Sequence, residues 1–187
     1  MRDHLVASAL ETLHRQGFNA SAVQDITDAA GLPKGSFYNY FDSKEALALE
    51  VIDRYGKERG ALGSVLSDES IRPVERLRQF FTLLTTGLAE QNYERGCLVG
   101  NFSTELADQS RPIRDRLAST FAAWSRPIEA CIQDAQKAGE ISRDGDPRDL
   151  AEFLLNSFEG AMLRMKVEKN SSPLDHFMTV IFSRVLT

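Results

Sequence analysis

A chain of 187 residues with 42% hydrophobic side chains is long enough to bury a core in one or two domains. It has no apolar run near the ~20 residues of a membrane span and no signal-peptide pattern, so we expect a cytoplasmic protein without membrane contact. Its formal net charge of −5 argues against a broadly basic nucleic-acid surface, because phosphate affinity comes mainly from Lys and Arg, and leaves DNA binding dependent on a local face and on dimerisation.

The first predicted helix runs from Arg2 to Gln16, where apolar residues recur at helical spacing and Gly17 closes the segment. The next stretch, residues 21–44 with the sequence SAVQDITDAAGLPKGSFYNYFDSK, predicts a helix-turn-helix. We expect Ser21 to cap its first helix in a reciprocal arrangement with Gln24.

The second helix of this motif is expected from about Lys34 to Phe41, after Gly31 ends the first one. Phe37 and Phe41 share one face and should be core, while the polar and aromatic side chains between them point outward. A short helix of this kind fits the major groove of DNA. A long helix should then start near Asp42 and continue to about residue 66.

The rest of the chain is interpreted from its pattern as further helices, with no strand-like alternation and no internal repeats. Polar or Pro-containing breaks separate the apolar segments. We expect helices at about residues 73–88, 97–108, 112–139, 150–167 and 173–186.

Residues 17–47, GFNASAVQDITDAAGLPKGSFYNYFDSKEAL, resemble the DNA-binding segment of the TetR family of bacterial repressors. The resemblance covers about the first quarter of the chain and is specific, because its capped helix, AAG turn, KGSFYNYF helix and FDSKEAL segment occur together in register. It implies an all-α homodimer of about nine helices. A helix-turn-helix domain at residues 1–45 would bind DNA, and a helical bundle at residues 46–187 would sense a ligand and dimerise.

Two departures from the family pattern bear on DNA binding. Pro33 stands where a hydroxyl residue is common before Lys34, so one possible phosphate contact is lost. The sequence also begins almost directly on its first helix, so we expect no basic arm that reaches the minor groove.

The expected DNA contacts are of two kinds. Ammonium and hydroxyl donors suit phosphate oxygens, whereas short polar side chains on the recognition helix can reach base edges, where Gly35 lets the backbone approach closely. The alternative for each residue is an ordinary polar position on a surface helix. We assign phosphate contacts to Ser21, Lys34, Tyr38 and Lys44, and base contacts to Ser36 and Asn39.

The last two predicted helices are more apolar than a peripheral pair in a monomer should be. We therefore expect an isologous dimer interface built as a four-helix bundle, which would place two recognition helices about one DNA turn, ~34 Å, apart. The alternative is that these helices pack only within their own domain. The predicted interface residues are Leu154, Phe158, Met162, Phe177, Ile181, Phe182 and Val185.

Apolar side chains from three middle helices should face one another, either as a filled core or around a ligand cavity. The sequence leaves both possibilities open. The expected ligand contacts among them are Phe80, Phe81, Leu84, Phe102, Phe121 and Trp124.

Cys97 lies near the start of a predicted helix and close to Arg95, and both features favour the thiolate. The segments GCLVGNFSTELAD and GAMLRMK are similar to those of a TetR subset that responds to reactive electrophiles or oxidants. That resemblance implies that Cys97 is the reactive thiol and that Lys166 lies nearby. The alternative is a small buried cysteine without reactivity, which we expect for Cys131.

These features together predict a repressor that binds double-stranded palindromic operator DNA as a homodimer and is released by a small-molecule effector. The alternative is a helical ligand-binding or redox-sensing protein without specific DNA binding. No phosphate loop or nucleophile elbow is present, so we expect no enzyme activity. The two cysteines and three histidines show no metal-ligand spacing, so no metal or other cofactor is expected.

Overall fold

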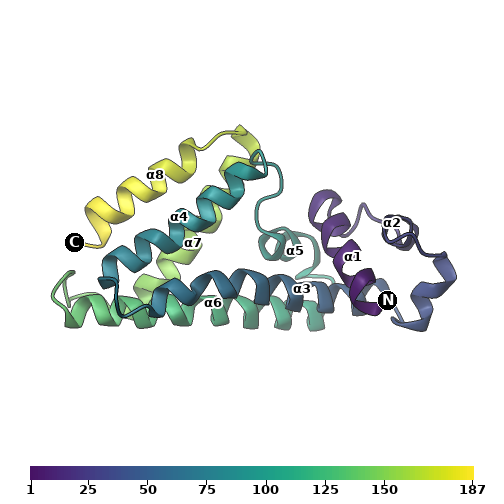
Figure 1. Cartoon of the computed structure of the whole chain (residues 1–187), viewed down its shortest axis with the longest axis horizontal. Helices are drawn as coiled ribbons and strands as arrows, with labels where there is room; N and C mark the ends of the chain where they lie inside the picture. The colour runs from purple at the N-terminus through teal and green to yellow at the C-terminus, as the bar shows by residue number, and fades with distance from the viewer. The chain divides into compact units, whose positions relative to one another are not determined.

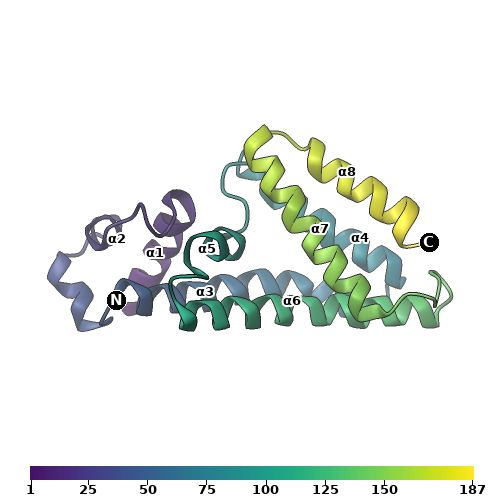
Figure 2. The same ribbon diagram turned by 180° about the vertical axis from the view of Figure 1, so that it is seen from behind.

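The computed structural model describes residues 1–187, and every regular element in it is helical, which confirms the all-α prediction (Figures 1 and 2). Two 3₁₀ helices, η1 (Lys34–Asn39) and η2 (Leu62–Ser67), and a π-helical turn, η3 (Ile181–Val185), accompany eight α-helices. With η1, which occupies the predicted recognition helix, the number of helices agrees with the nine expected. No helix combines the length and apolarity needed to cross a membrane. The α-helices are α1 (Arg2–Gln16), α2 (Val23–Ala29), α3 (Lys44–Ala61), α4 (Pro73–Glu90), α5 (Leu98–Leu106), α6 (Arg111–Lys137), α7 (Pro147–Glu168) and α8 (Ser172–Val180).

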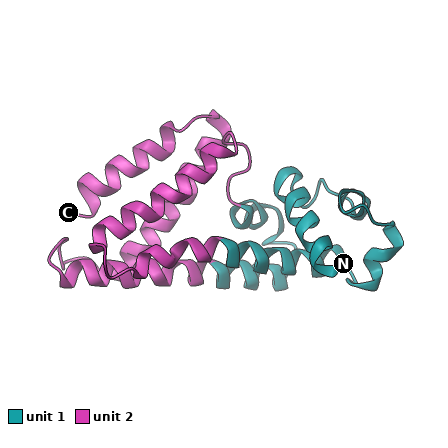
Figure 3. Cartoon of the chain, in the orientation of Figure 1, with its two compact units in different colours: residues 1–58, 98–120 teal, residues 59–97, 121–187 magenta.

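The chain forms two compact units, coloured in Figure 3. Unit 1 contains residues 1–58 and 98–120, and unit 2 contains residues 59–97 and 121–187. The chain therefore passes from one unit to the other within α3, directly before α5 and within α6. The domain boundary expected after residue 45 lies at the start of α3 and stays a prediction about where the DNA-binding function ends.

The core of unit 1 joins the first three helical elements with α3. Leu5 and Leu13 of α1, Ile26 of α2, Phe37 of η1 and Leu47 of α3 are all fully buried. Burying such side chains removes most of their apolar surface from water, each contributing roughly 1.5–3 kcal/mol. This core fixes how η1 is presented on the surface of the unit.

The structure corrects the predicted cap of α2 and the predicted start of the long helix near Asp42. The helix α2 begins at Val23, and the carboxylate of Asp25 accepts a 2.6 Å hydrogen bond from the backbone N–H of Ala22. Ser21 is buried instead, and its hydroxyl donates to the carbonyl of Gly17 at 2.7 Å. A carboxylate is the better partner at this position because the positive end of the helix dipole favours an anion. At α3 the cap is Ser43, which accepts from the N–H of Ala46 at 3.0 Å.

Unit 2 is built from α4, the later part of α6, α7 and α8. Figures 1 and 2 show α8 lying along α7 and α4. The rings of Phe81, Phe158 and Phe177, one from each of these helices, pack with centroids 5.0–5.3 Å apart. Aromatic pairs at this spacing stabilise a core beyond the area they bury.

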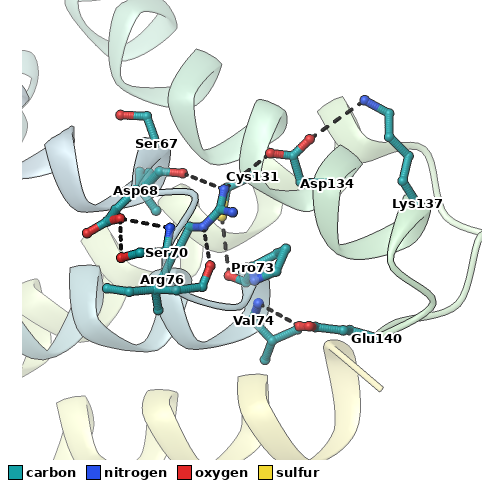
Figure 4. Close-up of polar contacts among 12 residues, drawn as sticks. Ser67, Asp68, Ser70, Pro73, Val74, Arg76, Cys131, Asp134, Lys137 and Glu140 are labelled. Carbon is teal, nitrogen blue, oxygen red and sulfur yellow. Dashed lines mark hydrogen bonds and ion pairs between the residues drawn. The ribbon is translucent and has the colours of Figure 1, made fainter.

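A polar cluster around the buried Arg76 ties the start of α4 to α6 (Figure 4). The guanidinium donates to the carbonyl of Ile71 at 2.7 Å and to Asp134 at 3.3 Å. In the same cluster, Cys131 donates its S–H to the carbonyl of Pro73 at 3.3 Å. Burial raises the pKa of the Cys131 thiol to about 11, so this cysteine is core, as expected.

Replacing the buried guanidinium should destabilise unit 2. We expect Arg76→Leu to lower the free energy of unfolding by about 2 kcal/mol or more, because carbonyl groups of the η2–α4 loop would lose their donor. Arg148→Leu is the matched control, since Arg148 is exposed and its ion pair is with Glu152 one helical turn away, and its cost should stay under about 0.5 kcal/mol. Urea denaturation of both variants measures the difference, and equal costs would contradict a structural role for Arg76.

Candidate nucleic-acid interface and small-molecule cavity

The recognition segment η1 is anchored by its aromatic residues and exposes its polar ones. Phe37 is fully buried and Phe41 is 5% exposed, which confirms their assignment to the core. Lys34 and Asn39 are exposed, and Tyr38 is 60% exposed although its ring packs edge-on against Phe37. Three side chains with hydrogen-bonding groups thus project from a rigidly held segment.

Gly35 and Ser36 complete this exposed segment in different ways. A Cβ atom at Gly35 would meet nothing within 4 Å, and its φ is not in the left-handed region, so the fold itself does not require glycine there. The absence of a side chain instead leaves room for a neighbour outside the chain. Ser36 donates its hydroxyl proton to the carbonyl of Pro33 at 2.6 Å, and its oxygen can still accept.

Lys44 and Ser21 have a different place: they support the α1–α2 turn, residues 17–22. The ammonium of Lys44 donates to the carbonyls of Phe18 and Ser21, both at 2.8 Å, and lies 4.0 Å from the centre of the Phe18 ring. Burial lowers the pKa of Lys44, while the charges of Glu105 and Asp25 oppose that shift. Lys44 therefore joins α3 to the turn, a position that the sequence pattern could not distinguish from an open phosphate contact.

The other side of the same turn is held by α5, which belongs to unit 1. Glu105 accepts from the N–H of Asn19 at 2.8 Å, and Phe102 packs edge-on against Phe18 with centroids 6.0 Å apart. Gly17 has a φ of 86°, and a Cβ there would lie 2.8 Å from a carboxylate oxygen of Glu105. Glycine is therefore favoured at this turn for its backbone angle, and a side chain there would also displace the carboxylate of Glu105.

Unit 2 contains a small cavity of about 90 Å³ between α3, α4, α6 and α7. Apolar side chains supply most of its wall, and Arg59 and Glu159 are the two charged residues that line it. Gly60 and Ala123 line it as well and are exposed, so they mark its opening. The full lining is Arg59, Gly60, Gly63, Phe80, Leu84, Ala123, Trp124, Pro127, Ile128, Leu155, Phe158, Glu159 and Met162.

The predicted ligand contacts divide between lining and packing positions. Phe80, Leu84 and Trp124 line the cavity. Phe81 is fully buried in the aromatic core, and Phe121 lies edge-on to Trp124 with centroids 5.9 Å apart. Phe102 packs in unit 1. Helical spacing identified the apolar faces correctly but did not show which members of a face border the empty space.

Arg59 and Glu159 were missed by the sequence interpretation. Glu159 stands in the apolar stretch SFEGAML, where a lone carboxylate is the signal that was overlooked. Its side chain is hydrogen-bonded to Cys97, the residue directly before α5. Burial raises the pKa of the Glu159 carboxyl, against the hydrogen bond from Cys97 and the charge of Arg59. The S–H group donates and the carboxylate accepts in this pair.

Cys97 and Cys131 are both buried and form no disulfide. Cys97 is 5% exposed, and its place before the first turn of α5 agrees with the helix start expected there. The side chain of Lys166 lies beside Gly96, with its Cδ 3.6 Å from where a Cβ of that glycine would be. The structure thus places Lys166 against the neighbour of Cys97, and Glu159 against Cys97 itself.

The helices α7 and α8 carry both buried and exposed apolar residues. Leu154, Phe158, Met162, Phe177 and Ile181 of the predicted dimer interface are buried within unit 2, while Phe182 and Val185 are half-buried. The five buried residues therefore hold the two helices to their own unit.

The apolar surface that remains open on α7 lies at other positions. Phe153, Leu163 and Val167 are 50%, 63% and 77% exposed. Beside them, a groove of about 250 Å³ runs between α7 and α8, with Gly160 and His176 among its lining residues. Apolarity alone did not separate this outer face from the inner one.

Comparison with known proteins identifies relatives over nearly the whole chain. A family model described as "Bacterial regulatory proteins, tetR family" matches residues 5–51, and one described as "Tetracyclin repressor-like, C-terminal domain" matches residues 73–181. The HTH-type transcriptional repressor DhaR of Mycobacterium sp. (strain GP1) is 44% identical over 100% of this chain and 92% of its own. The transcriptional regulator AcuR of Cereibacter sphaeroides is 37% identical over 96% of this chain and 82% of its own. A crystal structure of regulatory protein TetR from Rhodobacter sphaeroides is 36% identical, with a TM-score of 0.90 over 95% of both chains.

The two lysines of the interface should differ in what they contribute to folding. We expect Lys44→Ala to lower the free energy of unfolding by about 1–3 kcal/mol, because two carbonyls of the α1–α2 turn lose a charged donor. Lys34→Ala, at an exposed position of the same unit, should change it by less than about 0.5 kcal/mol. Thermal and urea unfolding of the two variants test this contrast. An unchanged stability of Lys44→Ala would show that the hydrogen bonds of Lys44 contribute nothing to the free energy of unfolding.

Proposed function

This chain belongs to the TetR family and is a DNA-binding transcriptional repressor. From that premise we propose the following mechanism. The protein binds a palindromic operator as a homodimer and leaves the operator when a small molecule enters the cavity of unit 2. The observation that carries this proposal is η1, which is anchored by Phe37 and presents Lys34, Tyr38 and Asn39 around a glycine that the fold does not need.

In this proposal the exposed residues of η1 contact DNA directly. Lys34 and Tyr38 bind phosphates and set affinity, while Asn39 and the oxygen of Ser36 contact base edges and set sequence preference. Gly35 allows the DNA backbone to approach closely. Ser21 and Lys44 contribute to DNA binding indirectly, because they hold the geometry of the α1–α2 turn. The backbone amides at the start of α2, which follow this turn, can bind a phosphate.

The dimer of this proposal forms through the exposed face of α7 and the groove beside α8. Phe153, Leu163 and Val167 would form an apolar patch unusual for a monomer, and a second copy of the chain presents the same patch. Phe182 and Val185, both half-buried, lie at the edge of this surface in the proposal. The two-fold pairing would set the separation of the recognition segments to about one DNA turn, ~34 Å.

The effector of this proposal is a small molecule, specifically a reactive electrophile or oxidant sensed at Cys97. Three features support it: the cavity wall includes Glu159, Glu159 is hydrogen-bonded to Cys97, and Lys166 packs beside the preceding residue. Residues 46–187 carry sensing and dimerisation in this view, and residues 1–45 carry DNA binding. The α5 helix links the two functions because it starts directly after Cys97 and supports the α1–α2 turn.

A second candidate function is a ligand-binding or redox-sensing helical protein without specific DNA binding. The net charge of −5 favours it, and η1 has only one basic residue, Lys34. Operator binding decides between the two functions. A repressor should form a discrete, salt-sensitive complex with the DNA that flanks its own gene. If an intact dimer forms no such complex even at low salt, the repressor proposal is wrong.

The close approach at η1 can be tested with one methyl group. We expect Gly35→Ala to weaken operator binding about tenfold or more, since the added Cβ would stand where the DNA backbone approaches, while folding stays intact. Gly87→Ala in α4 is the matched control, because a Cβ there also meets nothing within 4 Å. Fluorescence anisotropy with labelled operator measures both, and equal affinities for the two variants would contradict direct contact at Gly35.

The dimer face can be tested with one charge. Leu163→Glu should raise the dimer dissociation constant at least about tenfold, because an unpaired carboxylate would be buried in the proposed interface. Leu83→Glu is the control, since Leu83 is also exposed but belongs to α4. Sedimentation equilibrium of both variants measures the association, and a dimer that resists Leu163→Glu but not Leu83→Glu would move the interface to another face.

A further inference from the structure

The carboxylate of Glu159 connects the cavity with a buried thiol. Of the residues that line the cavity it is the one carboxylate, and it is hydrogen-bonded to Cys97. Neither group belongs to the polar cluster around Arg76. A thiol paired with a carboxylate at the wall of an apolar cavity is an arrangement for proton transfer.

We propose that Glu159 is the base that takes the proton of Cys97 when the thiol adds to a small α,β-unsaturated carbonyl compound that reaches the Glu159–Cys97 pair through the cavity. This inference rests on the proposed function, because it names the chemical class of the effector and the residue that activates its target. It assigns Glu159 a role that neither the family resemblance nor the sequence pattern indicated.

The addition balances without an oxidant or reductant. The sulfur of Cys97 forms a bond to the β-carbon of the reagent, and the S–H bond breaks as its proton passes to the carboxylate of Glu159. The π electron pair of the C=C bond moves toward the carbonyl group. Glu159, now protonated, returns the proton to the α-carbon, so the product is a thioether and the carboxylate is restored.

The chemistry of the neighbours favours Glu159 as the proton acceptor. An ammonium such as that of Lys166 can stabilise a thiolate but has no lone pair to accept its proton. Burial in the apolar wall raises the pKa of Glu159, which brings its proton affinity closer to that of a thiol and makes it a stronger base. Arg59, which also lines the cavity, keeps its positive charge and can balance the charge left on the reagent.

The cavity limits the reagent by size. Its volume of about 90 Å³ is smaller than the ~150 Å³ cavity that accommodates benzene in a protein core. Its opening at Gly60 and Ala123 has no bulky side chain. Short enals and enones with a compact apolar body fit these limits.

The thioether would act on DNA binding through the chain itself. Once Cys97 carries a substituent it can no longer donate its hydrogen bond to Glu159. The next residue begins α5, whose Phe102 and Glu105 hold the α1–α2 turn in unit 1. A shift at the start of α5 therefore alters the support of the recognition segment.

The test is the rate at which methyl vinyl ketone modifies Cys97 in the full-length protein, followed by mass spectrometry from pH 5 to pH 9. In the wild type we expect the rate to rise first through an inflection in the acid range, as Glu159 ionises, and again as the thiolate forms. Glu159→Gln should lose the first rise and react about tenfold or more slowly near pH 7. The Lys166→Met variant should keep the inflection, which assigns it to Glu159.

Two controls keep the result decisive. Cys131, whose raised thiol pKa of about 11 makes it a slow reporter, should remain unmodified in every variant, and its labelling would reveal a loosened fold. If Glu159→Gln loosens the fold, the pH dependence of the wild-type modification rate decides alone. A wild-type rate without an inflection in the acid range overturns the proposal. An intact Glu159→Gln that reacts as fast as wild type, or faster because a repelling carboxylate is gone, also overturns it.

Failure of this inference is separable from failure of the proposed function. Operator affinity of unmodified Glu159→Gln should match that of wild type, since the base acts only in the reaction. Cys97→Ser should bind operator but should not be released by methyl vinyl ketone. Release of Cys97→Ser by the ketone would leave the repressor proposal standing and remove the thiol addition.

Discussion

The α1–α2 turn is the point on which the rest of the structure depends, because side chains from two other helices satisfy its backbone. The ammonium of Lys44 binds two of its carbonyls from α3, and the carboxylate of Glu105 binds an N–H from α5. A turn without these donors and acceptors would leave polar groups unpaired near the core of unit 1. These contacts hold the turn that directly precedes α2, the first helix of the helix-turn-helix.

Much of the fold could be predicted from the sequence, because glycine and proline mark most helix ends and apolar spacing marks the helix faces. The expected cap of α2 was wrong because Asp25, and not its neighbour Gln24, bonds back to the N–H at the start of the helix, while Ser21 turns to the carbonyl of Gly17. The residues that line the cavity were predicted only in part. Spacing identifies an apolar face but not whether a member such as Phe81 fills the core or, like Phe80, borders a void.

The surface functions show a similar limit of sequence interpretation. The outer and inner faces of α7 are both apolar, so Leu163 and Leu154 cannot be told apart by hydrophobicity. The position of α5 in unit 1 depends on contacts between residues more than eighty positions apart, as from Asn19 to Glu105, which no local pattern reveals. A carboxylate within an apolar run, as at Glu159, is by contrast a local signal that the sequence itself contains.

The opening of the cavity has a consequence for how such a sensor could diversify. A Cβ atom added at Gly60 would meet no neighbouring atom within 4 Å, so a small side chain there can narrow the entrance without disturbing the core. Most core positions do not tolerate such drift, because close packing transmits every change in volume. Descendants of one gene could thus acquire different chemical preferences while their folding and operator recognition stay under separate selection.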